Sequence, residues 1–173
     1  MTYESLSSVD ARLFQGFSRH QAVTRCWRKE NGAWVIRDIA FTEEWNDADY
    51  ARLSGELTDT AQKGGRVIAA MEDRRVVGFI AVENAPLGSR GQYRQLSCMQ
   101  VSAPYRGKGL GRKLFTLAAD AARALGGEKL YISAHSSVES QAFYRAMGCT
   151  EAEEYDPALT AAEPCDCQME YAL

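Results

Sequence analysis

The residues with the clearest chemical potential form one run past the middle of the chain, Arg106-Gly107-Lys108-Gly109-Leu110-Gly111-Arg112-Lys113. Glycines let a backbone approach a ligand and turn its N–H groups toward it. The helix expected next presents free N–H donors and a partial positive charge. Basic side chains at that helix start are disfavoured by the dipole unless an anion compensates them. The run therefore predicts a phosphate site; the alternative is a solvated basic turn, which costs little at a surface.

Two common phosphate-binding classes do not fit this run. A P-loop requires Gly-x-x-x-x-Gly-Lys-Ser/Thr, and this pattern is absent. The dinucleotide pattern Gly-x-Gly-x-x-Gly fails because, counted from Gly107, its last position is Arg112. The run also follows an expected hairpin instead of opening a βαβ unit. A dinucleotide-dependent oxidoreductase, with Glu128 near the spacing of a ribose-binding acid, is therefore a minor alternative.

A second chemical signal lies on a helix expected over residues 137–147. Ser136-x-x-Glu139 is typical of a capping box. At about 100° per residue, one half of this helix is apolar and is predicted to face the core: Val138, Ala142, Phe143, Ala146 and Met147. The other half groups three hydroxyls: Ser137, Ser140 and Tyr144. Tyr144 is thus predicted to face a site, the alternative being a surface tyrosine.

Together the two segments resemble the GNAT superfamily of N-acetyltransferases. Val101-x-x-x-Tyr105-Arg106-Gly107-Lys108-Gly109-Leu110-Gly111 is similar to its acetyl-CoA signature, Arg/Gln-x-x-Gly-x-Gly/Ala. Phe143-Tyr144-x-x-x-Gly148 is similar to its later Phe-Tyr-x-x-x-Gly element. The resemblance covers about Val76 to Cys149. It implies transfer of an acetyl group from acetyl-CoA to a primary amine, of a small molecule more readily than of a protein. The alternative is a non-catalytic acyl-CoA sensor.

The resemblance also implies roles for particular residues. The pyrophosphate would rest on the amides of Arg106 to Arg112, and the pantetheine would pair like an added strand with Met99 to Val101. A backbone N–H near Gln100 or Val101 would polarise the thioester carbonyl. Tyr144 would be the catalytic acid that protonates the thiolate. The implied cofactor-binding residues are Met99, Gln100, Val101, Arg106, Gly107, Lys108, Gly109, Leu110, Gly111, Arg112, Ser137, Ser140 and Tyr144.

Two of these positions depart from the family pattern. The family usually has Asn where Ser137 stands and often Ala where Ser140 stands. A serine can hydrogen-bond the pantetheine arm, but its reach is shorter than that of asparagine. The general base is not specified by any motif: the candidates are Glu83, Glu43, Glu44, Glu170 and His135, and a chain of water molecules would also serve. The acceptor is open, although aromatic and acidic residues such as Trp45 would suit a cationic amine.

The elements that must position these residues alternate between strands and helices. We expect a short helix over 8–17, hairpin strands over 23–28 and 34–39, a helix from Asn46 to about 64, hairpin strands over 67–71 and 76–83, a loop over 84–91, a strand over 93–101, a helix ending near 125, a strand over 129–134, the helix over 137–147, and strands over 149–155 and 165–173. Within 93–101, apolar residues change from even to odd positions after Cys98, which predicts a β-bulge unless both faces are buried.

These elements predict a single α/β (α+β) domain. The resemblance implies a mixed, mostly antiparallel sheet of about six to seven strands, flanked by helices and with a splayed central strand pair. It divides the chain into a variable part (1–65), an acetyl-CoA-binding core (66–148) and C-terminal strands (149–173). The bulge would separate the fourth strand from the fifth, near Ile132 to His135, and open a slot for the pantetheine.

Composition limits the remaining classes of function. The chain has 173 residues, with 23 acidic against 20 basic side chains and a formal charge of −3, so we expect no nucleic acid and no anionic membrane as partner. No apolar run approaches the roughly 20 residues of a membrane helix, and no signal peptide is recognised, which favours the cytoplasm. The odd number of cysteines, five, predicts reduced thiols, and Cys165-x-Cys167 lacks a second ligand pair for a metal. A homodimer is left open.

Overall fold

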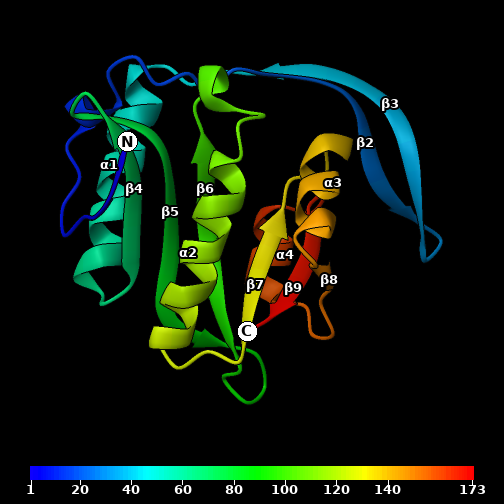
Figure 1. Cartoon of the computed structure of the whole chain (residues 1–173). Coiled ribbons are helices and arrows are strands. Elements are labelled where there is room, and N and C mark those ends of the chain that lie inside the picture. The colour runs from blue at the N-terminus through cyan, green and yellow to red at the C-terminus, as the bar shows by residue number, and fades with distance from the viewer.

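A seven-stranded sheet in the order β1-β4-β5-β6-β7-β9-β8 forms the frame of the protein in a computed structural model that describes residues 1–173 (Figure 1). Its strands are β1 (Thr2–Ser5), β4 (Arg66–Glu72), β5 (Arg75–Leu87), β6 (Tyr93–Val101), β7 (Lys129–Ala134), β8 (Thr150–Glu151) and β9 (Cys167–Ala172). All neighbours pair antiparallel except β6 and β7, which run parallel. The expected mostly antiparallel sheet is confirmed.

Helices cover both faces of this sheet. The four α-helices are α1 (Asp47–Gln62), α2 (Leu110–Ala124), α3 (Val138–Ala146) and α4 (Pro157–Ala162). Alternate residues of β5 point to opposite faces: Ile80 and Val82 pack in one core with α2, whereas Phe79 and Ala81 pack in another with α1. Figure 1 shows α2 in front of β5 and β6. None of the helices combines the length and apolar character that a membrane crossing requires.

The start of α1 follows the capping pattern that its sequence indicates. The Asn46 side chain accepts hydrogen bonds from the backbone N–H groups of Ala48 and Asp49, at 2.9 and 3.1 Å. The Asp49 carboxylate in turn accepts from the Asn46 N–H at 2.9 Å, which completes a capping box. The helix ends before Gly64, which adopts a φ of +84°. These terminal contacts set where α1 begins and ends.

The predicted β-bulge lies in β6 at Ser97. Ala81 pairs with Cys98 and Val82 with Leu96, so Ser97 has no partner of its own. Leu96 and Met99 both pack on the α2 side, whereas Cys98 packs on the α1 side. Beyond the bulge, β6 and β7 separate, because they pair only over Tyr93–Gln95. The expected splayed strand pair is therefore confirmed.

A long hairpin stands apart from the sheet. Its strands, β2 (Gln21–Glu30) and β3 (Ala33–Glu43), are longer than expected and turn at Asn31 and Gly32. They cross the end of the sheet and curve away past α3 (Figure 1). A lone two-stranded hairpin is marginally stable, and the body supports this one. The Trp27 N–H donates to Ser136 O at 2.8 Å, and the Trp34 indole donates to Glu151 at 3.2 Å.

Several expected elements differ from the structure. The helix expected over 8–17 is only a 3₁₀ turn, Ala11–Phe14. The expected loop over 84–91 is in part strand, since β5 continues to Leu87 and Pro86 pairs with Arg94 after a register shift. Proline lacks an N–H group, so it is tolerated here because the ladder is already irregular. The strand expected over 149–155 shortens to β8, and neither β1 nor α4 was predicted.

Candidate active site

The start of α2 is built to face an anion. Its N-cap is Gly109, with a φ of +84° that suits glycine, and no side chain caps the first turn. The first turn carries no acidic residue, so its N–H groups have neither a helix partner nor a nearby carboxylate. A Cβ placed on Gly107 or Gly109 would meet no atom within 4 Å. The backbone of this loop is therefore open to a ligand.

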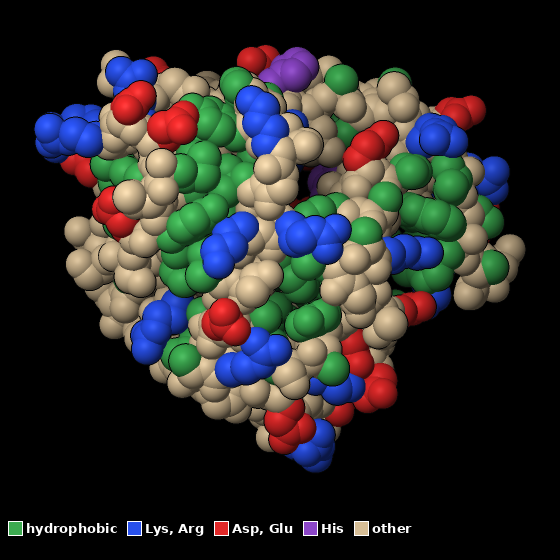
Figure 2. Space-filling model, in the orientation of Figure 1, with side chains coloured by type: hydrophobic (Ala, Val, Ile, Leu, Met, Phe, Trp, Pro, Cys, Tyr) green, Lys and Arg blue, Asp and Glu red, His purple; other side chains and the backbone are tan.

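This loop forms one wall of a cleft of about 720 Å³. The cleft lies between the beginning of β2, the free edge of β6, the start of α2 and the helix α3. Its lining residues are His20, Gln21, Ala22, Met99, Gln100, Val101, Ala103, Arg106, Gly107, Gly109, Gly111, Arg112, Glu139, Ser140, Phe143 and Tyr144. Figure 2 shows a hollow in this face with Lys and Arg side chains beside it. Size and shape suit an extended ligand with an anionic end.

Ten of the thirteen predicted binding residues line this cleft. The three that do not are Lys108, Leu110 and Ser137. The Lys108 ammonium lies over the Tyr105 ring, 5.6 Å from its centroid, and the Leu110 side chain is buried in the core. Ser137 is 0% exposed and its hydroxyl caps α3 by accepting from the Ser140 N–H at 3.3 Å. The expected contact from the Ser137 side chain is therefore corrected, because this hydroxyl serves its own helix.

The expectations for α3 need a further correction. Its N-cap is Ser137 instead of Ser136, whose hydroxyl accepts from Arg28 at 2.8 Å. The buried residue of the helix is Gln141, whose amide donates to the carbonyl of His135 at 2.9 Å, whereas Ala142 is exposed. The apolar stripe is therefore confirmed in part: Phe143 and Met147 pack against the core, whereas the contact of α3 with the end of β7 is the polar one made by Gln141.

The basic side chains of the loop have different tasks. Arg106 donates to Val101 O at 2.9 Å and to His20 O at 2.7 Å, and so ties the loop to β6 and to the segment before β2. Burial and, to a smaller extent, the charge of Arg19 lower the pKa of the Arg106 guanidinium. Arg112 lines the cleft without an ion pair within the protein, so it is the cation free to meet an anion there.

Tyr144 lies in the same cleft, as its helical position predicts. Its hydroxyl makes no hydrogen bond within the protein. Burial raises the pKa of Tyr144, with smaller contributions from Cys98, Cys149 and Asp166. The phenol therefore keeps its proton at neutral pH and can act as an acid toward a group in the cleft.

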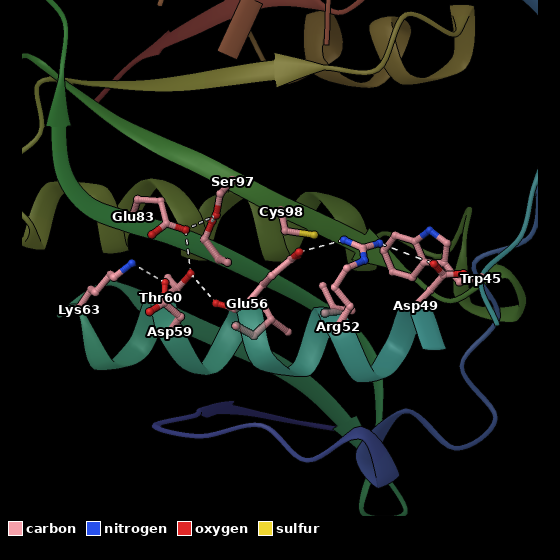
Figure 3. Close-up of a pocket in the computed structure, with 13 residues that line it drawn as sticks. Trp45, Asp49, Arg52, Glu56, Asp59, Thr60, Lys63, Glu83, Ser97 and Cys98 are labelled. Atoms are coloured by element: carbon pink, nitrogen blue, oxygen red, sulfur yellow. Dashed lines mark hydrogen bonds and ion pairs between the residues drawn. The ribbon is translucent and has the colours of Figure 1, made fainter. Parts of the chain in front are cut away.

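A second cavity, a groove of about 390 Å³, lies on the α1 face of the sheet (Figure 3). It is lined by α1, the middle of β5 and the bulge of β6, through Trp45, Asp49, Arg52, Leu53, Glu56, Leu57, Asp59, Thr60, Lys63, Ala81, Glu83, Ser97 and Cys98. Cys98 lines this groove and the next residue, Met99, lines the cleft. The bulged strand is thus a wall that the two cavities share. Burial raises the pKa of the Cys98 thiol to about 12.

The candidate bases are separated clearly by the structure. Both oxygens of Glu43 are engaged, by Arg19 at 2.5 Å and by His135 at 3.2 Å. The other ring nitrogen of His135 accepts from the Ser137 N–H at 3.1 Å, so neither nitrogen is free. Glu170 lies against Lys129 and Tyr93, at 2.6 and 2.5 Å. Neither Glu44 nor these residues line a cavity described above. Of the candidate bases, only Glu83 lines the groove.

Some residues that line the two cavities were not predicted from the sequence. Those in the cleft are His20, Gln21, Ala22, Ala103, Glu139 and Phe143. Of the residues that line the groove, the sequence pointed only to Trp45, as an aromatic residue suited to a cationic amine, and to Glu83, as a candidate base. No spacing in the sequence links positions 45–63 to positions 81–98, since only the fold brings them together.

Comparisons with known proteins agree with this architecture. Residues 23–149 match the model of the Acetyltransferase (GNAT) family. No curated protein sequence matches the chain significantly. Among solved structures, a nourseothricin acetyltransferase superposes with a TM-score of 0.70 at 20% identity, over 99% of this chain and 97% of its own. A Bacillus anthracis str. Ames protein, an inferred streptothricin acetyltransferase in complex with acetyl coenzyme A, superposes with a TM-score of 0.66 at 13% identity, over 99% and 95%.

A third neighbour is the PaiA N-acetyltransferase of Thermoplasma acidophilum in complex with coenzyme A, with a TM-score of 0.54 at 17% identity over 73% of this chain and 74% of its own. At such identities the solved structures establish the shared fold. The family match, by contrast, covers well over half of the chain and includes both the loop that opens α2 and Tyr144. This protein therefore belongs to the GNAT family of acetyltransferases and is an enzyme that takes its acetyl group from acetyl-CoA.

Proposed function

We propose that the enzyme transfers the acetyl group to a primary amine of a small molecule by direct attack of the amine. The observation that carries this proposal is the pair of cavities on either side of the bulged strand β6. One cavity suits the donor and the other has room for an acceptor. The lining thiol, Cys98, has a pKa raised to about 12 by burial, so it stays neutral and is a poor intermediate carrier of acetyl.

The residues of the cleft supply the donor side of this reaction. The main-chain amides from Gly107 to Arg112 bind the diphosphate, and the free edge of β6 at Met99–Val101 pairs with the pantetheine arm. A backbone N–H on the same edge, near Gln100 or Val101, stabilises negative charge on the thioester oxygen. The proposal treats the chain as one domain whose acetyl-CoA-binding core spans residues 66–148. The cytoplasm is the compartment that we propose for the reaction.

Tyr144 supplies the proton for the leaving thiolate. Burial raises the pKa of this phenol, and burial raises the proton affinity of a thiolate in the same cleft for the same reason. The two pKa values therefore shift in one direction, and the transfer from oxygen to sulfur stays close to balanced. Ser140 lies beside Tyr144 in the cleft and can donate to the pantetheine arm.

The two full-length neighbours support a small-molecule acceptor. Their names assign nourseothricin and streptothricin as acceptors of those proteins, and each aligns with nearly the whole chain, including the segments around the groove. Nourseothricin is thus the first compound to test, followed by linear diamines, an aminoglycoside and a lysine peptide.

The test is release of free thiol from acetyl-CoA on addition of each amine. We expect saturable, amine-dependent release with at least one small molecule, and an acetylated amine in the products. If acetyl-CoA binds but none of these amines causes it to release free thiol, the result would contradict acetyl transfer and support the sensor alternative. Preferred turnover of the lysine peptide would contradict the small-molecule acceptor.

A further inference from the structure

The groove on the α1 face runs along the whole of α1. Its lining begins at Trp45, before the helix, and ends at Lys63, after it, with the bulge residues Ser97 and Cys98 on the opposite side (Figure 3). A helix rises about 1.5 Å per residue, so the groove can accommodate a chain of many bonds. Because Cys98 lines the groove and its neighbour Met99 lines the donor cleft, the bulge is where the two cavities adjoin along β6.

Carboxylates outnumber cations in this groove. The lining has four carboxylates, Asp49, Glu56, Asp59 and Glu83, against the two cations Arg52 and Lys63. Arg52 lies between two of them, 3.6 Å from Asp49 and 2.9 Å from Glu56. The groove therefore has a net negative charge that favours a positively charged occupant.

Lys63 is engaged in a similar way. Its ammonium lies 2.6 Å from the Asp59 carboxylate. Asp59 is the main reason that the pKa of Lys63 is raised, and Glu83 contributes least. Glu83 is thus the one carboxylate in the groove that has no ion pair within the protein.

Glu83 is held in place by hydroxyls instead. Thr60 of α1 and Ser97 of the bulge both donate to its Oε1, at 2.8 and 2.5 Å. The other oxygen, Oε2, makes no hydrogen bond within the protein. Figure 3 shows the three side chains converging between α1 and the bulge. A fixed carboxylate with one free oxygen, beside the bulge, is suited to receive a hydrogen-bond donor that carries positive charge.

We propose that the groove binds a linear cationic alkylamine and that Glu83 Oε2 receives its reacting ammonium group beside the bulge. This inference rests on the proposed function and adds to it an acceptor class and an acceptor-binding residue. The alkyl chain of the amine lies along α1, with Leu53 and Leu57 as apolar contacts. Further ammonium groups of the acceptor face the carboxylates that remain along the helix.

The proposed step balances in atoms and electrons. Glu83 takes one proton from the ammonium, and the nitrogen lone pair forms the C–N bond to the thioester carbonyl carbon. The C–S bond breaks with its electron pair on sulfur, and Tyr144 gives sulfur a proton. The nitrogen returns a second proton to Tyr144 and keeps the third in the amide. Glu83 passes its proton to water, so one proton is released for each acetyl group transferred.

Calorimetric titration of the full chain with 1,6-diaminohexane tests the binding without any turnover. We expect saturable binding to the wild type and an affinity about 10- to 100-fold lower in Glu83→Gln, the range for loss of a charge-assisted hydrogen bond. Glutamine retains the oxygen that Thr60 and Ser97 bind, so the fold is preserved. The matched control is Glu128→Gln, which removes an exposed carboxylate paired with Arg90 outside both cavities and is expected to bind like the wild type.

Kinetics and acetyl-CoA binding distinguish a failure of the acceptor assignment from a failure of the proposed function. In Glu83→Gln the KM for the diamine should rise by a similar factor, while the affinity for acetyl-CoA stays unchanged. Equal diamine binding by Glu83→Gln and the wild type, or no saturable binding by the wild type, would overturn the role of Glu83 and the acceptor class. Neither result would contradict the proposed function, which fails if none of the tested amines releases thiol from acetyl-CoA or if the lysine peptide is the preferred acceptor.

Discussion

The two cavities on either side of β6 are built in different ways. The donor cleft depends on backbone groups from one short run, Gly107 to Arg112, at the start of a helix. The acceptor groove depends on side chains from α1, β5 and β6, which lie far apart in the sequence. The donor is common to the family, whereas the acceptor is particular to one enzyme. A site formed by backbone groups depends on a local sequence motif, so it can be recognised from the sequence. A site formed by distant side chains can change by single substitutions and has no such motif.

The charges of the two cavities differ as well. Arg112 faces the donor cleft without an ion pair, whereas the groove has more carboxylates than cations. An anionic donor and a cationic acceptor are therefore drawn to opposite faces of the same sheet, and they meet only at the bulge. Variants in one cavity should leave binding in the other unchanged.

The largest expected effect concerns the proton that Tyr144 gives to the leaving thiolate. Tyr144→Phe should lower kcat by about 10²- to 10⁴-fold, the range for loss of a general acid, while acetyl-CoA and diamine affinities stay near wild type. Steady-state kinetics with calorimetry on the same preparation measures all three. Tyr155→Phe, which changes an exposed tyrosine away from the cleft, is the control. A Tyr144→Phe enzyme with a normal kcat would remove Tyr144 from the mechanism.

The next effect concerns the backbone of the donor loop. Gly109→Val should lower the affinity for acetyl-CoA by about 10- to 100-fold, or roughly 1.4–2.8 kcal/mol, because a β-branched residue is strained at a φ of +84° and redirects the N–H groups. Gly32→Val in the β2–β3 turn is the matched control, since Gly32 has a φ of +80° and equally open surroundings. Both variants should lose similar thermal stability, but only Gly109→Val should lose affinity. A shared loss of affinity would indicate general destabilisation instead.

The pH dependence tests both proton transfers. The acceptor binds as its ammonium form and loses a proton to Glu83 inside the groove, so kcat/KM should not follow the amine pKa near 10 and should stay level between pH 7 and pH 9. Burial raises the pKa of Tyr144 above its ordinary value of 10.0, so the acid form is kept as the pH rises and is lost only above that value. The pH–rate profile should therefore stay level through pH 9 without a descending limb. A fall in kcat beginning below pH 9 would contradict the assigned state of Tyr144.

The smallest expected effect separates two arginines of the donor loop. Arg112→Ala should weaken acetyl-CoA binding by about 2- to 5-fold, equivalent to roughly 0.4–1 kcal/mol for an exposed ion pair, and should weaken its salt dependence. Arg106→Ala should act differently, through thermal stability, because its guanidinium holds Val101 O and His20 O. Calorimetry at two salt concentrations and a melting curve measure these effects. Equal effects of both variants on stability and on affinity would show that the arginines share one role.

The sequence predicted local features well. The glycine-rich turn before α2, the bulge beside Cys98 and the position of Tyr144 in the cleft are each set by neighbours within a few positions. The resemblance implied a contact between Ser137 and the pantetheine arm, because the family usually has Asn at this position, whereas in the structure the Ser137 hydroxyl caps α3.

Features that depend on distant segments could not be predicted. Glu83 was one of several acidic candidates until the fold placed it between Thr60 and Ser97. The hairpin of β2 and β3 was predicted, but its path across the end of the sheet depends on contacts with Ser136 and Glu151. Side chains that meet only through tertiary structure leave no regular spacing along the chain.

The central claim is that main-chain amides at the start of α2 bind the diphosphate of the donor. Calorimetry of the wild type and of Gly109→Val, with acetyl-CoA and with S-acetylpantetheine, which lacks the diphosphate together with the 3′-phosphoadenosine, tests it most directly, because Gly109→Val should weaken the binding of acetyl-CoA alone. Loss of at least two charge-assisted hydrogen bonds predicts that S-acetylpantetheine binds about 100-fold or more weakly. Equal affinities for the two compounds would show that the loop does not bind the diphosphate and would contradict the assignment of the cleft.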